Sequence, residues 1–272
     1  STKQSSIAIC VDGQVRGEYT WYSNNNHSTE LLRNVQHLMS TCQCSLAQLD
    51  AMAVATGPGS FNGVRVAMVT AKSLAFALQK PLLGVSTLDA AAFQQRLWRG
   101  PICSVQEAGR SELYAACYRF DVDTRPATDA VATSTMQLLG DYVLMPPQEL
   151  AAYVREHATT WFEVPDEQHM PQLLFCGEIS ATARQILHAQ LGERCFFADD
   201  LSSTRHASAL AALALQRLQS GTVDDPLSLE PLYLRRPSIT TSTRKRSLFG
   251  GDGERTTGHD TTTEREEGAL RH

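Results

Sequence analysis

The sequence has no long hydrophobic run. Nowhere do about 18 apolar residues follow one another, so it predicts no membrane-spanning helix. The first ten residues, STKQSSIAIC, contain one lysine and no long apolar stretch, which does not fit the pattern of a secretory signal peptide. We therefore expect a cytoplasmic protein without membrane contacts.

The sequence also lacks an excess of positive charge. It contains 24 Lys and Arg against 29 Asp and Glu, a net charge of -5, so bulk attraction to nucleic acid is not indicated. Its 272 residues are 42% hydrophobic, enough for one or two globular domains with a real core. The seven cysteines show no paired metal-binding spacing beyond Cys42-x-Cys44, and we expect reduced thiols, most of them in the core.

Paired histidines at helical spacing are absent as well. No two of the eight histidines lie three or four residues apart, which excludes a helical His pair but not a metal site assembled from distant residues. Ser60, in GPGSF, does not lie in a Gly-x-Ser-x-Gly elbow, and a serine mechanism would need Ser, His and Asp from distant segments. The pattern does not favour a peptidase.

Alternation and turn signals predict an α/β protein. In the first 100 residues we expect a hairpin turning at Asp12-Gly13 and then alternating helices and strands. The predicted strands are 6–11, 15–22, 51–56 and 81–85, and the predicted helices are 28–40, 62–78 and 86–97. Ser86 and Asp89 are predicted to cap the last of these helices.

From Pro101 a looser version of the same order follows. Two paired strands are expected around Gly109-Arg110-Ser111, residues 121–170 read as irregular, and LLFCGE and CFFA read as strands. Helices are expected over roughly 180–191 and in HASALAALALQRLQ. The remaining stretch, 237–272, is polar and rich in threonine, so we expect a disordered tail.

The segment GPGSFNGVRVAMVTAKSLA, residues 57–75, carries two open interpretations. Its loop, Gly57, Gly59 and Ser60, could bind an anion or nucleotide at a helix N-terminus. However, it lacks the Gly-Lys-[Ser/Thr] ending of a P-loop, and Pro58 removes one N–H donor. The helix that follows repeats small residues every four positions, as Gly63, Ala67, Ala71 and Ala75. This small-residue ridge could pack inside the domain or against a partner, and the pattern alone favours internal packing.

The same segment resembles the signature of the TsaB family, also called YeaZ. The resemblance extends to STKQSSIAICVDG, HSTELL at 27–32, EAGRSELYAACY at 107–118 and PLYLRRP at 231–237. It implies a two-lobed actin-like/Hsp70-like ATPase (ASKHA) fold. The implied division is an N-terminal, partner-binding lobe over 1–100, a C-terminal lobe over 101–236 and the tail over 237–272.

The resemblance further implies a non-catalytic scaffolding subunit. It would bind the catalytic subunit TsaD through its first two helices and support transfer of a threonylcarbamoyl group to N6 of adenosine 37 in tRNA. With this implication, partner packing of the ridge becomes the favoured interpretation. The predicted contact residues are Leu31, Val35, Leu38, Gly63, Ala67, Ala71 and Ala75.

Other partners are implied by the same resemblance. They are the ATPase TsaE, TsaC, which makes the threonylcarbamoyl adenylate, tRNA reached through the complex, and a second copy of the chain when it is alone. ATP and metal would sit on the partner subunits, with no tightly bound cofactor here. TsaD carries a His-x-x-x-His pair where this chain has Thr87 and Ala91, so we expect neither catalytic nor metal-binding residues. The alternative is an ATP-dependent carbamoyl-type transferase or a glycoprotease-like metallopeptidase acting alone.

Three charged residues could add polar contacts at an interface. Arg65 lies near a helix N-terminus, which the helix dipole disfavours, so we expect a compensating carboxylate in this chain or in a partner. Arg110 and Glu112 read first as a local ion pair.

Finally, family members open with an apolar strand ending in Asp-Thr that has no counterpart here, so we expect the first N-terminal strand of the fold to be missing.

Overall fold

In the computed structural model of the chain, the described residues are 4–22, 27–121, 135–163, 169 and 171–234. They belong to one compact unit. The predicted disordered tail, 237–272, lies outside the described residues.

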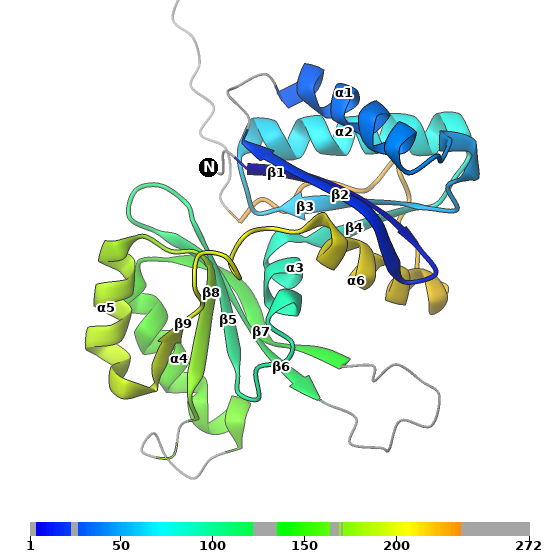
Figure 1. Cartoon of the computed structure of the whole chain (residues 1–272). Helices are drawn as coiled ribbons and strands as arrows, with labels where there is room; N and C mark the ends of the chain where they lie inside the picture. Colours follow the sequence, from blue (N-terminus) through cyan, green and yellow to red (C-terminus); the bar gives the residue numbers. More distant parts are fainter. Residues whose placement is uncertain (1–3, 23–26, 122–134, 164–168, 170, 235–272) are drawn as a thin grey trace, which may run out of the picture. The chain divides into compact units, whose positions relative to one another are not determined.

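The first third of the chain forms two small sheets covered by helices (Figure 1). Strands β1 and β2 pair antiparallel, and β3 and β4 pair parallel. Asp12 and Gly13 turn the first hairpin with φ of 51° and 76°, as the Asp-Gly signal predicts. The elements are β1 (Gln4–Val11), β2 (Gln14–Tyr22), α1 (His27–Thr41), β3 (Met52–Gly57), α2 (Phe61–Leu78), β4 (Leu82–Ser86) and α3 (Thr87–Gln94).

The next part of the chain builds a five-stranded sheet in the order β7-β6-β5-β8-β9. Strand β5 pairs antiparallel with β6 and parallel with β8. The elements are β5 (Ile102–Glu107), β6 (Leu113–Asp121), β7 (Thr135–Met145), α4 (Pro147–Phe162), β8 (Leu173–Glu178), α5 (Ala181–Leu191), β9 (Cys195–Phe197) and α6 (Ala207–Gln219).

The two faces of the five-stranded sheet pack against different helices. On one face, Val105 and Phe175 lie in a core with residues of α4 and α5. On the other face, Tyr118 and Cys176 lie in a core with residues of α3, α6 and β4. Helices α1 and α2 cover one side of β1–β4, and α3 and α6 lie on the other (Figure 1). Because α3 and α6 contact both the small sheets and the second core, they connect the two halves of the unit.

Helix α6 packs against strands on the other side of the predicted lobe boundary. It lies within 101–236, yet it packs against β1, β3 and β4. Arg217 of α6 donates two hydrogen bonds to Asp224, and the Gly84 N–H of β4 donates to the same carboxylate. Conversely, α3 precedes residue 100 but packs against β5 and β8. The predicted lobe boundary near residue 100 remains a prediction.

Two predictions about the secondary structure are wrong. Residues 121–170, expected to be irregular, contain the long strand β7 and the helix α4. Helix α4 begins with Pro147 at a position that needs no N–H donor. It buries Leu150, Val154 and Trp161 at helical spacing. Helix α3 also ends at Gln94, earlier than the predicted Leu97.

The expected state of the cysteines is confirmed. All seven are free, and Cys103, Cys117, Cys176 and Cys195 are buried in the core. Burial raises the pKa of the Cys176 and Cys195 thiols to about 12, so these groups stay protonated at neutral pH. They act as small core residues rather than as nucleophiles.

Candidate functional site

Helix α2 is the element that carries most of the predicted contact residues. Ser60 caps it, because its side chain accepts the N–H of Gly63 at 3.4 Å. At the other end, Gln79 adopts the left-handed conformation, with φ of 53°. The helix therefore spans the whole segment between two well-defined ends, and α1 packs beside it.

The structure turns most of the predicted contact residues toward the chain's own core. Ala75 is 1% exposed and Leu38 7% exposed. Val35 packs on the cluster of Ile9, Leu38 and Met39, and Ala67 and Ala71 pack on the cluster around Met52 and Met68. Leu31 and Gly63 are half-buried. The ridge thus packs mainly inside the unit, and contact with a partner through these residues remains a prediction.

The neighbouring column of α2 is different. Val69 is 63% exposed and Phe76 is 77% exposed, and Leu32 of α1 is 50% exposed. Large side chains left in water at these levels mark a candidate contact surface. We refer to these three residues as the exposed helix face. The sequence holds the signal, since Val69 and Phe76 recur two helical turns apart on the side away from Ala75.

Arg65 lies at the start of this column. Its guanidinium sits over the Phe61 ring at 3.9 Å, and its Nε donates to the Tyr233 hydroxyl at 3.0 Å. No carboxylate pairs with Arg65 among the described residues. Among the residues that the structure describes, Phe61 and Tyr233 contact Arg65 in place of the expected acid, and a carboxylate from a partner remains a prediction.

The other predicted polar residues lie apart from α2 in the chain. Arg110 and Glu112 belong to the turn between β5 and β6, where the Ala108 N–H donates to the Glu112 carbonyl at 2.9 Å. Arg110 has φ of 56° and is exposed, whereas Glu112 is half-buried. Their position in an exposed turn suits a surface contact and does not build a catalytic cluster.

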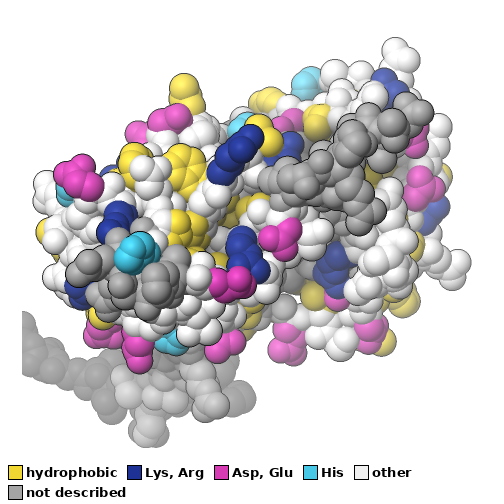
Figure 2. All heavy atoms as spheres, turned by 90° about the horizontal axis from the view of Figure 1, so that it is seen from below, with side chains coloured by type: hydrophobic (Ala, Val, Ile, Leu, Met, Phe, Trp, Pro, Cys, Tyr) yellow, Lys and Arg dark blue, Asp and Glu magenta, His cyan; other side chains and the backbone are white. Residues whose placement is uncertain are grey.

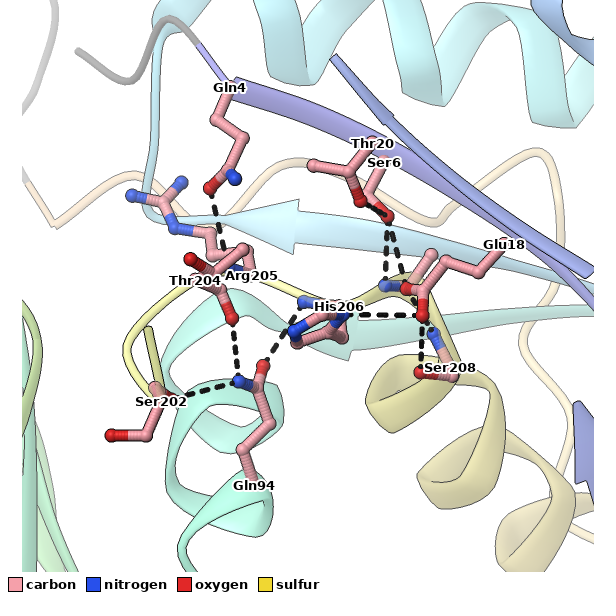
Figure 3. A network of polar contacts seen from close by, with 11 residues as sticks. Gln4, Ser6, Glu18, Thr20, Gln94, Ser202, Thr204, Arg205, His206 and Ser208 are labelled. Atoms are coloured by element: carbon pink, nitrogen blue, oxygen red, sulfur yellow. Dashed lines mark hydrogen bonds and ion pairs between the residues drawn. The ribbon is translucent and has the colours of Figure 1, made fainter. Parts of the chain in front are cut away.

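A polar network that the sequence did not reveal anchors α6 to the first hairpin (Figure 3). The Glu18 carboxylate accepts the Ser208 N–H at 3.2 Å and the Ser208 hydroxyl at 3.0 Å. His206 Nδ1 lies 3.2 Å from the same carboxylate, and Ser6 Oγ accepts the Ala207 N–H at 3.1 Å. An anionic group at a helix N-terminus is stabilising, so Glu18 acts as a cap for α6.

A second, half-buried network centres on Asp89, in the first turn of α3. The hydroxyls of Tyr118 and Tyr142 both donate to its Oδ1 at 2.7 Å. Burial raises the pKa of Asp89, although the two tyrosine hydroxyls oppose this. Ser86 caps α3 as predicted, accepting the Leu88 N–H at 3.2 Å. Asp89, in contrast, joins α3 to β6 and β7 rather than completing the predicted cap.

The surroundings of Asp89 form a cavity of about 520 Å³, lined by β4, β7 and α6. Thr87 and Ala91 lie on the same helix, and Ala91 is buried. In the part of the chain that the structure describes, no group of three His, Cys, Asp or Glu side chains is arranged to hold a metal. Over these same residues, no helix has the length and apolar character to span a membrane.

Comparisons with known proteins agree with this architecture. The family model described as TsaD, tRNA N6-adenosine threonylcarbamoyltransferase, matches residues 21–242. The tRNA threonylcarbamoyladenosine biosynthesis protein TsaB of Bacillus subtilis is 28% identical over 84% of this chain and 88% of its own length. The Escherichia coli protein of the same name is 34% identical over 44% of this chain and 53% of its own length.

A solved structure gives the same result. YeaZ from Pseudomonas aeruginosa superposes with a TM-score of 0.66 and 26% identity, over 86% of this chain and 96% of that chain. The expected actin-like α/β fold is thereby confirmed. The chain belongs to the family that the TsaD model describes, and within it to the TsaB (YeaZ) group.

Proposed function

We propose that the chain is the non-catalytic, scaffolding subunit of a tRNA threonylcarbamoyladenosine synthesis complex. It binds a TsaD-type catalytic subunit and supports transfer of the threonylcarbamoyl group to N6 of adenosine 37. The observation that carries this proposal is the similarity to Bacillus subtilis TsaB over 84% of the chain.

The exposed helix face supports docking of another protein. Leu32, Val69 and Phe76 offer apolar area on two neighbouring helices. Residues 51–88 contain no Asp or Glu, whereas Arg65 and Lys72 lie on α2. A matching surface on the partner is therefore apolar at its centre and carries carboxylates at its rim.

A non-catalytic role fits the residues at the positions where TsaD has its metal-binding histidines. Threonine is a poor ligand for iron or zinc and alanine is none, so Thr87 and Ala91 cannot replace that pair. We place ATP, metal and transfer chemistry on TsaD and TsaE, with TsaC supplying the threonylcarbamoyl adenylate. This chain would need no tightly bound cofactor of its own.

Contact with tRNA is proposed to be indirect. The net charge is -5, and on the face seen in Figure 2 basic and acidic side chains are interspersed. A surface that holds tRNA by itself usually presents a continuous basic area to the phosphates.

In the absence of TsaD, the exposed helix face would pair with the same face of a second copy of the chain.

A reconstitution tests the proposed function. The full chain is mixed with TsaD and TsaE of the same genome, TsaC, threonine, bicarbonate, ATP and tRNA, and modified adenosine is measured by mass spectrometry. The proposal predicts that modification depends on the chain, and that the chain alone with the same substrates modifies nothing. Equal modification with and without it would refute the scaffolding role, and transfer by the chain alone would favour an enzyme.

A further inference from the structure

The loop before α2 presents hydrogen-bond donors that the fold does not use. Ser60 satisfies the N–H of Gly63 with its hydroxyl and the N–H of Val64 with its carbonyl. The N–H groups of Gly59 and Ser60 donate to no other described residue. Both residues are half-buried, so a small ligand can reach them from solvent. The 18-residue helix α2 begins directly after Ser60, and its dipole favours negative charge at this N-terminal end.

Gln106 adds an independent observation that points to a ligand. It is 2% exposed, and neither Nε2 nor Oε1 has a hydrogen-bond partner among the described residues. The amide faces the loop, because a Cβ placed on Gly59 would lie 3.7 Å from Gln106 Nε2. A buried amide without partners costs stability, so its presence beside an open helix N-terminus needs a reason.

The charges at this end of α2 also favour an anionic ligand. The first turn contains no acidic residue, although acids are favoured there. Arg65 follows instead, held by Phe61 and Tyr233 rather than by a carboxylate. Helix dipole and arginine therefore add, and within the described residues nothing neutralises them.

We propose that the N-terminus of α2, with Gly59, Ser60, Gln106 and Arg65, binds a phosphoryl group. A tetrahedral oxyanion accepts hydrogen bonds from the two backbone N–H groups, Gln106 Nε2 and the Arg65 guanidinium. Gln106 Oε1 accepts from the P–O–H of a monohydrogen phosphate, so both ends of the buried amide gain a partner. Glycine at position 59 leaves room for the phosphoryl group. A Cβ added at this position would lie 3.1 Å from Val64 Cγ2 and 3.7 Å from Gln106 Nε2.

This site does not depend on the proposed function, so it is tested on the isolated full chain. Inorganic phosphate is titrated by calorimetry and by thermal unfolding, at constant ionic strength with chloride as the reference anion. Saturable binding and a rise in Tm with phosphate but not chloride are expected. ADP and adenosine are then used as competitors. Displacement by ADP alone identifies a nucleotide phosphate as the ligand, and displacement by neither identifies free phosphate.

Three variants and a control assign the site. Gln106→Leu keeps the volume and removes both unpartnered groups, so it is expected to fold and to bind phosphate at least about tenfold more weakly. Gly59→Ala is expected to weaken binding similarly, and Arg65→Gln to weaken it and reduce its salt dependence. Lys80→Gln, beyond the opposite end of α2, removes an equal charge and is expected to bind as the parent does. Absence of saturable phosphate binding, or binding unchanged in Gln106→Leu and Gly59→Ala, would overturn the proposal and leave an ordered water as the partner of Gln106.

Discussion

Val69 and Phe76 lie two turns apart on the same side of α2, and 63% and 77% of these side chains are exposed. Ala75, next to Phe76 in the sequence, is 1% exposed and packs into the core of β3 and β4. The helix thus separates two surfaces, one that holds the fold and one that is open to another protein.

The exposed helix face is expected to drive self-association of the isolated chain. Phe76→Ser removes a large apolar side chain from water at little cost to folding, so the dimer should dissociate at least about tenfold more readily. Sedimentation equilibrium measures this directly. Leu201→Ser is the matched control, because Leu201 is 86% exposed but lies on another segment. An equal loss of association in both variants would contradict the assignment.

The small-residue ridge is expected to control stability more than binding. Ala75→Leu inserts a larger side chain into a closed core and should lower the free energy of unfolding by about 1–3 kcal/mol. Ala77→Leu, on the exposed side of the same helix, should change it by less than about 0.5 kcal/mol. Urea unfolding of the two variants compares them. If both are equally stable, the ridge does not pack as the structure shows.

Glu18 is expected to stabilise the unit by holding the start of α6. Glu18→Gln keeps one acceptor oxygen and loses the charge and the second acceptor, so the free energy of unfolding should fall by about 1–2 kcal/mol. Glu163→Gln is the control, since Glu163 makes an exposed ion pair with Arg119 at 3.4 Å. The account fails here if the control variant is destabilised as much as Glu18→Gln.

Asp89 gives a pH dependence with a defined sign. Its pKa is raised in the folded protein, chiefly by burial, so the folded state binds more protons than the unfolded state between the two pKa values. Its contribution to stability therefore falls as pH rises from the ordinary aspartate value, about 4, through the raised one.

Tyr142→Phe sharpens this dependence. The substitution removes one of the two hydroxyl donors to the Asp89 carboxylate. The charged form of Asp89 therefore loses more stabilisation than the neutral form. The destabilisation should be larger at pH 7 than near pH 4, the ordinary aspartate value, as measured by urea unfolding at both values. Tyr153→Phe is the control, because in the structure Tyr153 packs against His157 and Trp161 instead of bonding to Asp89. A pH-independent effect of Tyr142→Phe would contradict the link.

Local signals in the sequence predicted much of the fold. The Asp12-Gly13 turn and the β5–β6 pair follow from alternation and turn residues alone. The sequence pattern does not predict strand β7, because Gly140 and Asp141 interrupt its alternation. Gly140 takes φ of 76° at a register shift against β6. Helix α4 carried its own signal in Pro147 and the spacing of Leu150, Val154 and Trp161.

The candidate sites were less predictable. The sequence showed that α2 has a column of small residues, but whether this column faces the core depends on the placement of β3 and β4. Asp89 reads as a capping residue because its partners, Tyr118 and Tyr142, lie on strands far along the chain. Gln106 carries no local signal either, since its lack of partners appears only once β5 is placed against Gly59.

The central claim is that this chain docks a TsaD-type subunit through the exposed helix face, and one measurement tests it most directly. The affinity of the full chain for TsaD of the same genome is determined by calorimetry for the parent, for Val69→Asp with Phe76→Asp, and for Leu201→Asp. The account predicts that the double variant remains folded and loses at least about 100-fold in affinity, while Leu201→Asp binds as the parent does. Binding of the folded double variant with parental affinity would contradict it.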